Sequence, residues 1–313
     1  MFKAIHAETG KDIISIDPSW ADRIDLLRLL DRQNKLLCQE CREPVRLKAG
    51  DEKVRHFAHK HLKNCSLANV SPEVLMVRAL VYARLVQEFG DHTTLEKAWT
   101  ISRPIDCFVD TASGGIAYWV IDRGIKREDR SVLEEGMKGI ATHVHWIFAS
   151  SMRKPLQENP SALSLTTTER ALMAQSSLDV EIKNGDLVRG KSLQYVDHKA
   201  AILDTHRSLE LVHAPQVYSS KPKMSPLADV LIAPKTGEFA HTGEHEQFLV
   251  VKAEWDRVKI PKRIAAEKEA TRLRIAQQAE AERQAWIAKE KAELHADLAA
   301  MAARASSLRS RSD

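Results

Sequence analysis

Three of the four cysteines lie between residues 38 and 65, beside two histidines. Cys38 and Cys41 form a Cys-x-x-Cys turn, whose two thiolates can bind one metal ion, and His56, His59 and Cys65 follow after a segment able to form a hairpin. Tetrahedral zinc needs four ligands. In an extended HFAH segment the two histidines fall on opposite faces, so we expect only one of them to bind the ion.

We favour Cys38, Cys41, His59 and Cys65 as the ligands of a structural zinc ion, with His56 as a neighbouring hydrogen-bond donor or a solvent contact. An ion held by four protein ligands has no open position, so its role is to stabilise the fold and not to catalyse a reaction. The alternative is two free thiols with surface histidines. Clustered cysteines beside histidines favour the metal site in a reducing compartment.

The composition is that of a globular protein with room for about two domains. The chain has 313 residues, 43% of them hydrophobic, and a net charge of +4, which permits contact with nucleic acid without requiring it. No apolar run reaches the length of a membrane span, and the N-terminal segment lacks the apolar core of a signal peptide. We therefore expect a cytoplasmic protein.

The elements that must position the metal ligands are short. Residues 2–17 predict a β-hairpin, and residues 19–33 predict a helix with Ser19 as its N-cap. A second helix is expected over 71–90, with Ser71 as its cap, Pro72 in its first turn and Gly90 at its end. Beyond it, alternating apolar runs predict strands over 97–102, 105–110, 116–122 and 143–149, with a helix over 127–140 before the last of them.

The remaining chain divides by composition. Recurrent turn signals over 155–250 predict short strands, which form either a small β-rich domain or an elaboration of the preceding one. From 256 onward Ala, Glu, Lys, Arg and Gln dominate, which predicts one long helix. Ile287, Leu294, Met301 and Leu308 repeat every seventh residue, so the helix is either a weak coiled coil or a solvated single helix.

These elements predict an α+β protein with four parts. They are an N-terminal hairpin and zinc-binding module over 1–67, a mixed α/β domain over 68–155, a β-rich region over 156–255, and a long charged helix with a disordered tip over 256–313.

The chain resembles the competence protein CoiA family. The resemblance is carried by LLCQECREPVRLKAG, by HFAHK followed by Cys65, and by the stretch from RPIDCFVD to HVHWIF, and it covers roughly residues 1–155. It implies a zinc-finger-like N-terminus before a nuclease domain of the restriction-endonuclease type. Such a domain holds Mg²⁺ with a glutamate from a helix, an aspartate from one strand and a Glu-x-Gln or Glu-x-Lys motif from the next.

Carried onto this chain, the helix glutamate falls on Glu73 and the strand aspartate on Asp106. The positions of the Glu-x-Gln motif, however, fall on Trp119 and Ile121. Neither side chain can bind Mg²⁺ or orient a water molecule. We therefore predict a degenerate nuclease centre whose fold persists as a DNA-binding or protein-binding module.

In the alternative reading the metal ligands have migrated. Asp122 is then the expected third acid beside Glu73 and Asp106, and Arg123 or Lys126 replaces the missing base. Asp110 is a further nearby acid.

The resemblance implies that the protein acts on DNA, and we favour a binding or scaffolding factor in DNA uptake, recombination or defence. One alternative is an active Mg²⁺-dependent nuclease with migrated ligands. Another is a structural subunit that assembles through the helix over 256–308.

Overall fold

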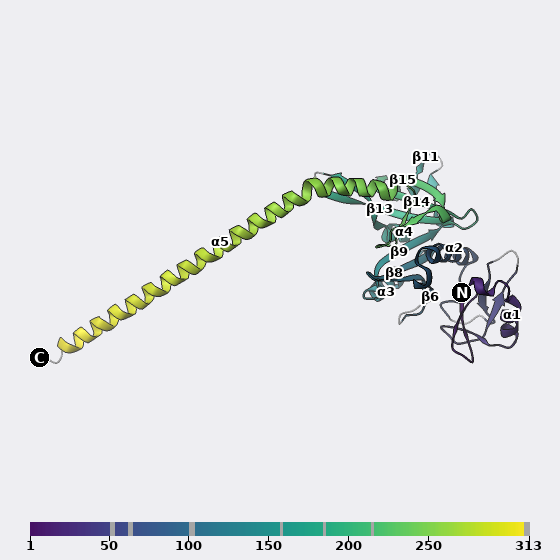
Figure 1. Cartoon of the computed structure of the whole chain (residues 1–313), viewed down its shortest axis with the longest axis horizontal. Helices are drawn as coiled ribbons and strands as arrows, with labels where there is room; N and C mark the ends of the chain where they lie inside the picture. The colour runs from purple at the N-terminus through teal and green to yellow at the C-terminus, as the bar shows by residue number, and fades with distance from the viewer. Residues whose placement is uncertain are drawn as a thin grey trace. The chain divides into compact units, whose positions relative to one another are not determined.

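A computed structural model of the chain describes residues 1–50, 54–61, 65–99, 104–156, 159–183, 186–213 and 216–309. By its internal contacts the chain divides into two units, residues 1–251 and residues 252–313. The first unit holds all the strands (Figure 1), and the second is purely helical over its described residues. The fold is mixed α+β with a large sheet, as predicted.

The N-terminal module begins with the predicted hairpin, β1 (Lys3–His6) and β2 (Asp12–Ile14), to which β3 (Leu36–Cys38) adds a third strand. The helix expected over 19–33 is shorter. Asp17 accepts a hydrogen bond from the Ser19 amide and caps a 3₁₀ turn, η1 (Pro18–Trp20), so α1 spans only Ile24–Arg32. Ser19 as the cap of α1 was therefore wrong, because the aspartate two residues earlier takes that role for a separate turn.

A second hairpin completes this module. Strands β4 (Val45–Lys48) and β5 (His56–His59) pair antiparallel, and this register places Val45 opposite His59 and Lys48 opposite His56. Val45 and Leu47 are buried while the alternate residues are exposed, as the two-residue period of a strand requires.

Helix α2 (Pro72–Phe89) has the predicted ends. The Ser71 hydroxyl accepts a hydrogen bond from the Val74 amide, and Gly90, at φ +55°, ends the helix in a conformation that side chains disfavour. Turn η2 (Gly90–His92) then leads directly into β6 (Thr93–Lys97). The strand expected over 97–102 was therefore placed too late, because β6 ends at Lys97; residues 100–102 of that prediction lie outside the described residues.

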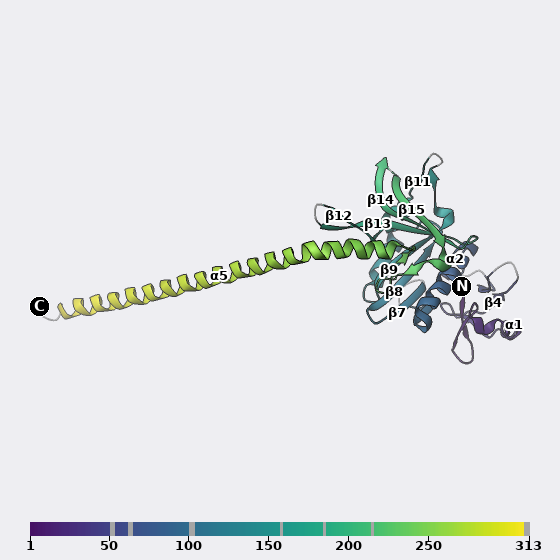
Figure 2. The same ribbon diagram turned by 45° about the horizontal axis from the view of Figure 1, so that its top comes forward.

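The central strands follow the prediction closely. They are β7 (Ile105–Thr111), β8 (Gly114–Ile121) and β9 (Ala141–Ala149), with α3 (Arg127–Met137) between the last two. Strands β6, β7 and β8 are antiparallel neighbours, whereas β8 and β9 are parallel because α3 carries the chain back across the sheet. Figure 2 shows β7, β8 and β9 side by side.

The region after β9 extends the same sheet. Strand β13 pairs parallel with β9, and the strand order from one edge to the other is β10-β11-β15-β14-β13-β9-β8-β7-β6, with β12 paired to β13. The remaining elements are η3 (Ser150–Met152), β10 (Pro155–Leu156), β11 (Asn159–Ser164), α4 (Thr167–Leu172), β12 (Ala174–Lys183), β13 (Asp186–Asp197), β14 (Ile202–His213), β15 (Val217–Pro226), η4 (Leu227–Asp229), β16 (Leu231–Ile232) and β17 (Phe239–Ala240).

The sheet is buried on both faces. Val77 and Val81 of α2 pack on one face, against Val109 and Val120. Leu133 of α3 and residues of α4 belong to the core on the other face. Burial on both sides explains the continuous apolar runs of β7 and β8.

Helix α5 (Glu244–Arg309) confirms the predicted long helix and begins earlier than residue 256. Within its described part, Ile275, Trp286 and Met301 are exposed. The side chains of Leu294 and Leu308, half of the predicted heptad pattern, lie outside the described residues. Among the described helices, none combines the length and apolarity needed to cross a membrane.

Candidate metal centre and nuclease-like site

The four predicted zinc ligands converge in the N-terminal module. Cys38 ends β3, and the tight turn after it places Arg42 at φ +59° and lets the Arg42 amide donate to the Cys38 carbonyl oxygen. This turn points Cys41 back toward β5, whose last residue is His59. Cys65 arrives from the following loop. Their ligand atoms all lie within 4.8 Å of one another.

The spacing of these atoms fits tetrahedral zinc. The Cys38 and Cys65 sulfur atoms are 3.9 Å apart, and the Cys41 sulfur lies 3.2 Å from Nε2 of His59. Two thiolates at about 2.3 Å from a tetrahedral ion are roughly 3.8 Å apart. Three sulfur atoms and one imidazole nitrogen are the donors that zinc prefers, so Cys38, Cys41, His59 and Cys65 could hold it.

The environment favours the neutral forms of Cys38, Cys65 and His59. Burial raises the pKa of the Cys38 and Cys65 thiols, and burial lowers the pKa of His59. A neutral imidazole is the form that binds a metal, and a bound cation is what stabilises thiolates in such a setting. His56 stands apart from the cluster, and its Nδ1 lies 2.8 Å from the Val54 carbonyl oxygen.

The residues at which the resemblance places a nuclease centre are arranged differently. Asp106, near the start of β7, is buried, and its Oδ1 lies 2.7 Å from Nη2 of Arg78 on α2. Its Oδ2 accepts a hydrogen bond of 2.7 Å from the Val120 amide. The Arg78 guanidinium also reaches Glu96, at 3.3 Å. Arginine thus supplies the positive charge beside Asp106, where a nuclease centre would need a metal ion.

Glu96 ties this ion-pair network to the N-terminus of the chain. It is fully buried at φ +49°, and its Oε2 accepts hydrogen bonds from the amides of Phe2 and Lys3 at 2.9 and 3.0 Å. We call Arg78, Glu96 and Asp106 the buried triad. Sequence reasoning missed Arg78 and Glu96. The available signal was an arginine in the middle of a helix that is otherwise apolar on most sides.

Glu73 and Asp122 make contacts outside the triad. The Glu73 carboxylate accepts hydrogen bonds from the amide and hydroxyl of Ser151, at 3.2 and 2.6 Å. Asp122 follows β8 and lies 3.6 Å from Nε of Arg123. Among the described residues, only the cysteine–histidine cluster forms a group able to hold a metal ion. Glu73, Asp106 and Asp122 belong to no such group. Asp110 pairs with Lys97 at 3.2 Å.

Trp119 and Ile121 lie in the core. Trp119 is fully buried on β8, and its ring stacks on that of Trp146, which lies directly opposite on β9, with centroids 6.1 Å apart. The ring of Trp99 also lies against it, at 5.9 Å. Apolar side chains therefore fill the positions where the resemblance places a metal-binding motif.

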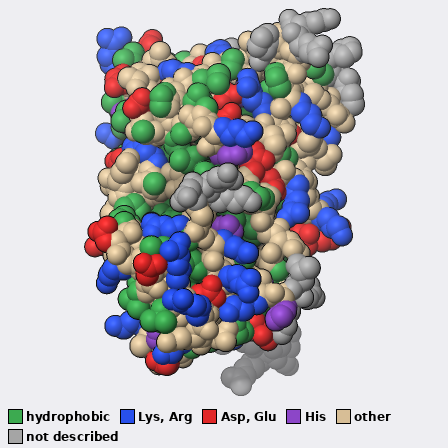
Figure 3. Space-filling model, turned by 90° about the vertical axis from the view of Figure 1, so that its right-hand side faces the viewer, with side chains coloured by type: hydrophobic (Ala, Val, Ile, Leu, Met, Phe, Trp, Pro, Cys, Tyr) green, Lys and Arg blue, Asp and Glu red, His purple; other side chains and the backbone are tan. Residues whose placement is uncertain are grey.

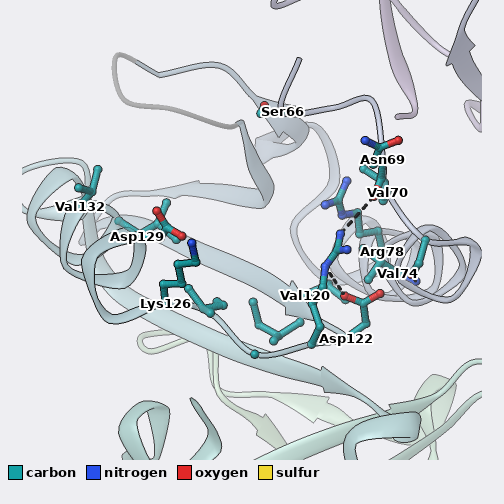
Figure 4. Close-up of a pocket in the computed structure, with 16 residues that line it drawn as sticks. Ser66, Asn69, Val70, Val74, Arg78, Val120, Asp122, Lys126, Asp129 and Val132 are labelled. Carbon is teal, nitrogen blue, oxygen red and sulfur yellow. Dashed lines mark hydrogen bonds and ion pairs between the residues drawn. The ribbon is translucent and has the colours of Figure 1, made fainter. Parts of the chain in front are cut away.

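A pocket of about 440 Å³ opens beside the end of β8. Asp122, Arg123 and Lys126 line it from the loop before α3, and Arg78 lines it from α2. The Arg123 guanidinium donates from Nη2 to the Asn69 carbonyl oxygen at 3.2 Å, and its Nε lies 3.6 Å from Asp122. Figure 4 shows Asn69 and Asp122 on the same side of the pocket, beside α2.

The metal cluster lies in a segment that is similar to a known protein family. Residues 21–68 match the family model described as "Competence protein CoiA, N-terminal domain". This segment contains all four residues of the metal cluster. No curated protein and no solved structure matches the chain at a significant level.

Proposed function

We propose that this chain, whose residues 21–68 match the N-terminal domain of the competence protein CoiA family, is a cytoplasmic, competence-related factor that binds DNA and does not cleave it efficiently. Its role lies in DNA uptake, recombination or defence. The observation that carries the second half of the proposal is the buried triad: Arg78 forms an ion pair with Asp106 and another with Glu96, so each of these carboxylates already has a cation beside it in place of Mg²⁺.

The order of elements supports a nuclease-like ancestry for this part of the chain. Helix α2, the antiparallel strands β6, β7 and β8, helix α3 and the parallel strand β9 follow the helix–strands–helix–strand order expected for residues 68–155. In such an arrangement the acids would gather on β7 and β8, beside the N-terminus of α2. Here Trp119 and Ile121 are packed into the core instead.

The charge of the N-terminal module supports contact with DNA. Arg46 and Lys48 project from the exposed face of β4, and neither forms an ion pair within the described part of the chain. Arg42 is exposed in the preceding turn. Figure 3 shows Lys and Arg side chains gathered in the lower half of the face that it views. Cations on the exposed face of a strand suit phosphate contacts that do not depend on sequence.

The metal cluster serves this surface as a scaffold. Cys38 and Cys41 lie just before β4, and His59 ends its partner strand, so a zinc ion bound to these residues would fix the hairpin that carries Arg46 and Lys48. Four protein ligands leave no position for a substrate, so the ion stabilises and does not catalyse.

Fluorescence anisotropy with labelled duplex and single-stranded DNA tests the binding half. We expect binding that weakens with salt, and we expect the double variant Arg46→Glu/Lys48→Glu to weaken it by at least about tenfold at low salt, because two cations that neutralise phosphates become anions. The charge-matched control Lys221→Glu/Lys235→Glu changes two exposed residues outside the module. Equal binding by both double variants would refute the proposed surface.

A second candidate function is assembly through α5, supported by the exposure of Ile275, Trp286 and Met301 along the helix. Residues 1–251 form a compact unit by themselves, so a chain that ends near 255 is a suitable comparison. Sedimentation of the two chains decides this: an unchanged oligomeric state on truncation removes the support for assembly through the helix.

A further inference from the structure

The pocket beside β8 combines cations with the beginnings of two helices. Its walls come from residues 66–71 and the first turns of α2, from the end of β8, and from the loop and first turns of α3. The N-terminus of a helix carries partial positive charge and unpaired N–H groups. Lys126, the N-cap of α3, forms no side-chain hydrogen bond to that helix, so it leaves the first-turn amides of α3 without a cap of this kind.

Arg78 provides an independent sign of a ligand. It is 2% exposed, lines the pocket, and uses its two Nη atoms for Glu96 and Asp106. Its Nε is buried and has no hydrogen-bond partner among the described residues. A buried donor without an acceptor is costly, so an acceptor that entered the pocket from the side away from the triad would be stabilised there.

The other charged groups of the pocket are balanced but loosely held. Arg123 is largely exposed, and its contact with Asp122, at 3.6 Å, is longer than a hydrogen bond. Lys126 and Asp129 lie near each other at the start of α3 (Figure 4), and they form no ion pair with each other in the described structure. To turn toward an incoming anion, Arg123 gives up one exposed hydrogen bond, from its Nη2 to the Asn69 carbonyl oxygen, and Lys126 breaks no ion pair among the described residues.

The rest of the lining is largely apolar, and the pocket of about 440 Å³ falls within the usual size of small-molecule sites, about 300–1,000 Å³. An inorganic anion alone would leave these apolar walls uncovered. A ligand that carries both a phosphate and a compact apolar part satisfies both kinds of wall. The apolar lining consists of Val70, Val74, Val120, Ile121, Ile125, Val132 and Leu133.

We infer that this pocket binds one nucleotide of a DNA strand, with its phosphate against Arg78, Arg123 and Lys126 and its sugar or base against the apolar wall. The inference rests on the proposed function, and it gives the pocket a binding role that needs no metal ion. The phosphate belongs either to a 5′ end or to the continuous backbone, and the two sources can be separated by experiment.

The test compares two short labelled duplexes of one sequence, one with 5′-phosphate ends and one with 5′-hydroxyl ends, by anisotropy over a salt series. The variants are Arg123→Ala/Lys126→Ala, which removes the cations, and Val132→Trp, which fills the pocket without changing charge. Arg127→Ala is the matched control, because Arg127 is an exposed cation next to Lys126 that does not line the pocket.

We expect Arg123→Ala/Lys126→Ala to weaken binding and to reduce the slope of log K against log salt by up to about 0.9, since the pocket neutralises one phosphate and each neutralised phosphate adds about 0.9 to that slope. Val132→Trp should weaken binding with a smaller change in slope, and Arg127→Ala should bind like the wild type. If the wild type prefers the duplex with 5′-phosphate ends and the double variant does not, the phosphate that the pocket binds is a terminal one. Equal weakening for both duplexes identifies the backbone.

Two outcomes overturn the inference, and they differ from each other. If both pocket variants bind both duplexes like Arg127→Ala, with an unchanged salt slope, the pocket takes no nucleotide although the basic hairpin can still bind DNA. If the wild type binds neither duplex, the proposed function fails together with this inference.

Discussion

Replacement of Arg78 by methionine should strongly destabilise the protein. The guanidinium lies 2.7 Å from Asp106 and 3.3 Å from Glu96, and all three side chains are only 1–2% exposed. Methionine keeps most of the volume but leaves two carboxylates buried without their cation. Breaking a buried ion pair in this way costs about 3–5 kcal/mol. That is a large part of the roughly 5–15 kcal/mol that holds a typical domain folded.

The free energy of unfolding, from urea titrations followed by circular dichroism, measures this effect. Arg84→Met is the control on the same helix. Arg84 is also buried, but it bonds to the Val230 carbonyl oxygen and to the partly exposed Glu88, so its replacement should cost only about 1–3 kcal/mol.

The triple variant Arg78→Met/Glu96→Gln/Asp106→Asn separates charge from packing. Without buried charges it should regain part of the stability that Arg78→Met removes. A destabilisation below about 1 kcal/mol for Arg78→Met, or a triple variant less stable than the single one, would refute the reasoning that a buried charge network organises this site.

Three further predictions concern other parts of the fold. Chelation of metal, or Cys41→Ser, should unfold the N-terminal module. Elemental analysis should then show loss of zinc, and proteases should cut at new sites within residues 1–67. A module that still resists proteolysis after chelation would contradict the zinc assignment. Burial favours a raised pKa for Glu238 and Glu244, but hydrogen bonds from Arg207 and its charge hold both below their usual 4.5. Their contribution to stability is therefore present above pH 4.5 and disappears as the pH falls through the lowered pKa values. The difference in unfolding free energy between wild type and Arg207→Met should shrink below pH 4.5. A difference that stays constant with pH would count against the ion pairs of Arg207 with Glu238 and Glu244. Ser71→Ala removes the cap of α2 and should cost about 1 kcal/mol in urea unfolding, whereas Ser71→Asp should retain most of the stability.

Local signals in the sequence identified the metal cluster and most elements of the first half. Cys38 and Cys41 needed only a short turn, and the alternation of HFAH correctly separated His59 from His56. The ends of α2 followed from Ser71 and Gly90, since caps depend on neighbouring residues alone. Continuous apolar runs indicated strands β7, β8 and β9, because strands of a sheet that is covered on both faces have such runs.

The missed features depend on partners that are distant in sequence. Nothing near Arg78 indicates that its partners are Glu96 and Asp106, because the triad exists only once α2 packs on β6 and β7. The pairing of β13 with β9 is likewise non-local, so the sequence left open whether residues 155–250 form a domain of their own. The early start of β6 depends on η2, a turn that the strand pattern did not reveal.

Incubation of the full-length protein with supercoiled plasmid in Mg²⁺ or Mn²⁺ tests the central claim most directly. The proposed function predicts that the plasmid is bound, as seen by its retarded migration before protein is removed, and that it is recovered intact afterwards. If the protein nicks the plasmid, and if Asp106→Ala and Asp122→Asn both abolish the nicking, then metal-dependent cleavage survives and the account is contradicted. Asp122→Asn is included because it disturbs folding less than Asp106→Ala.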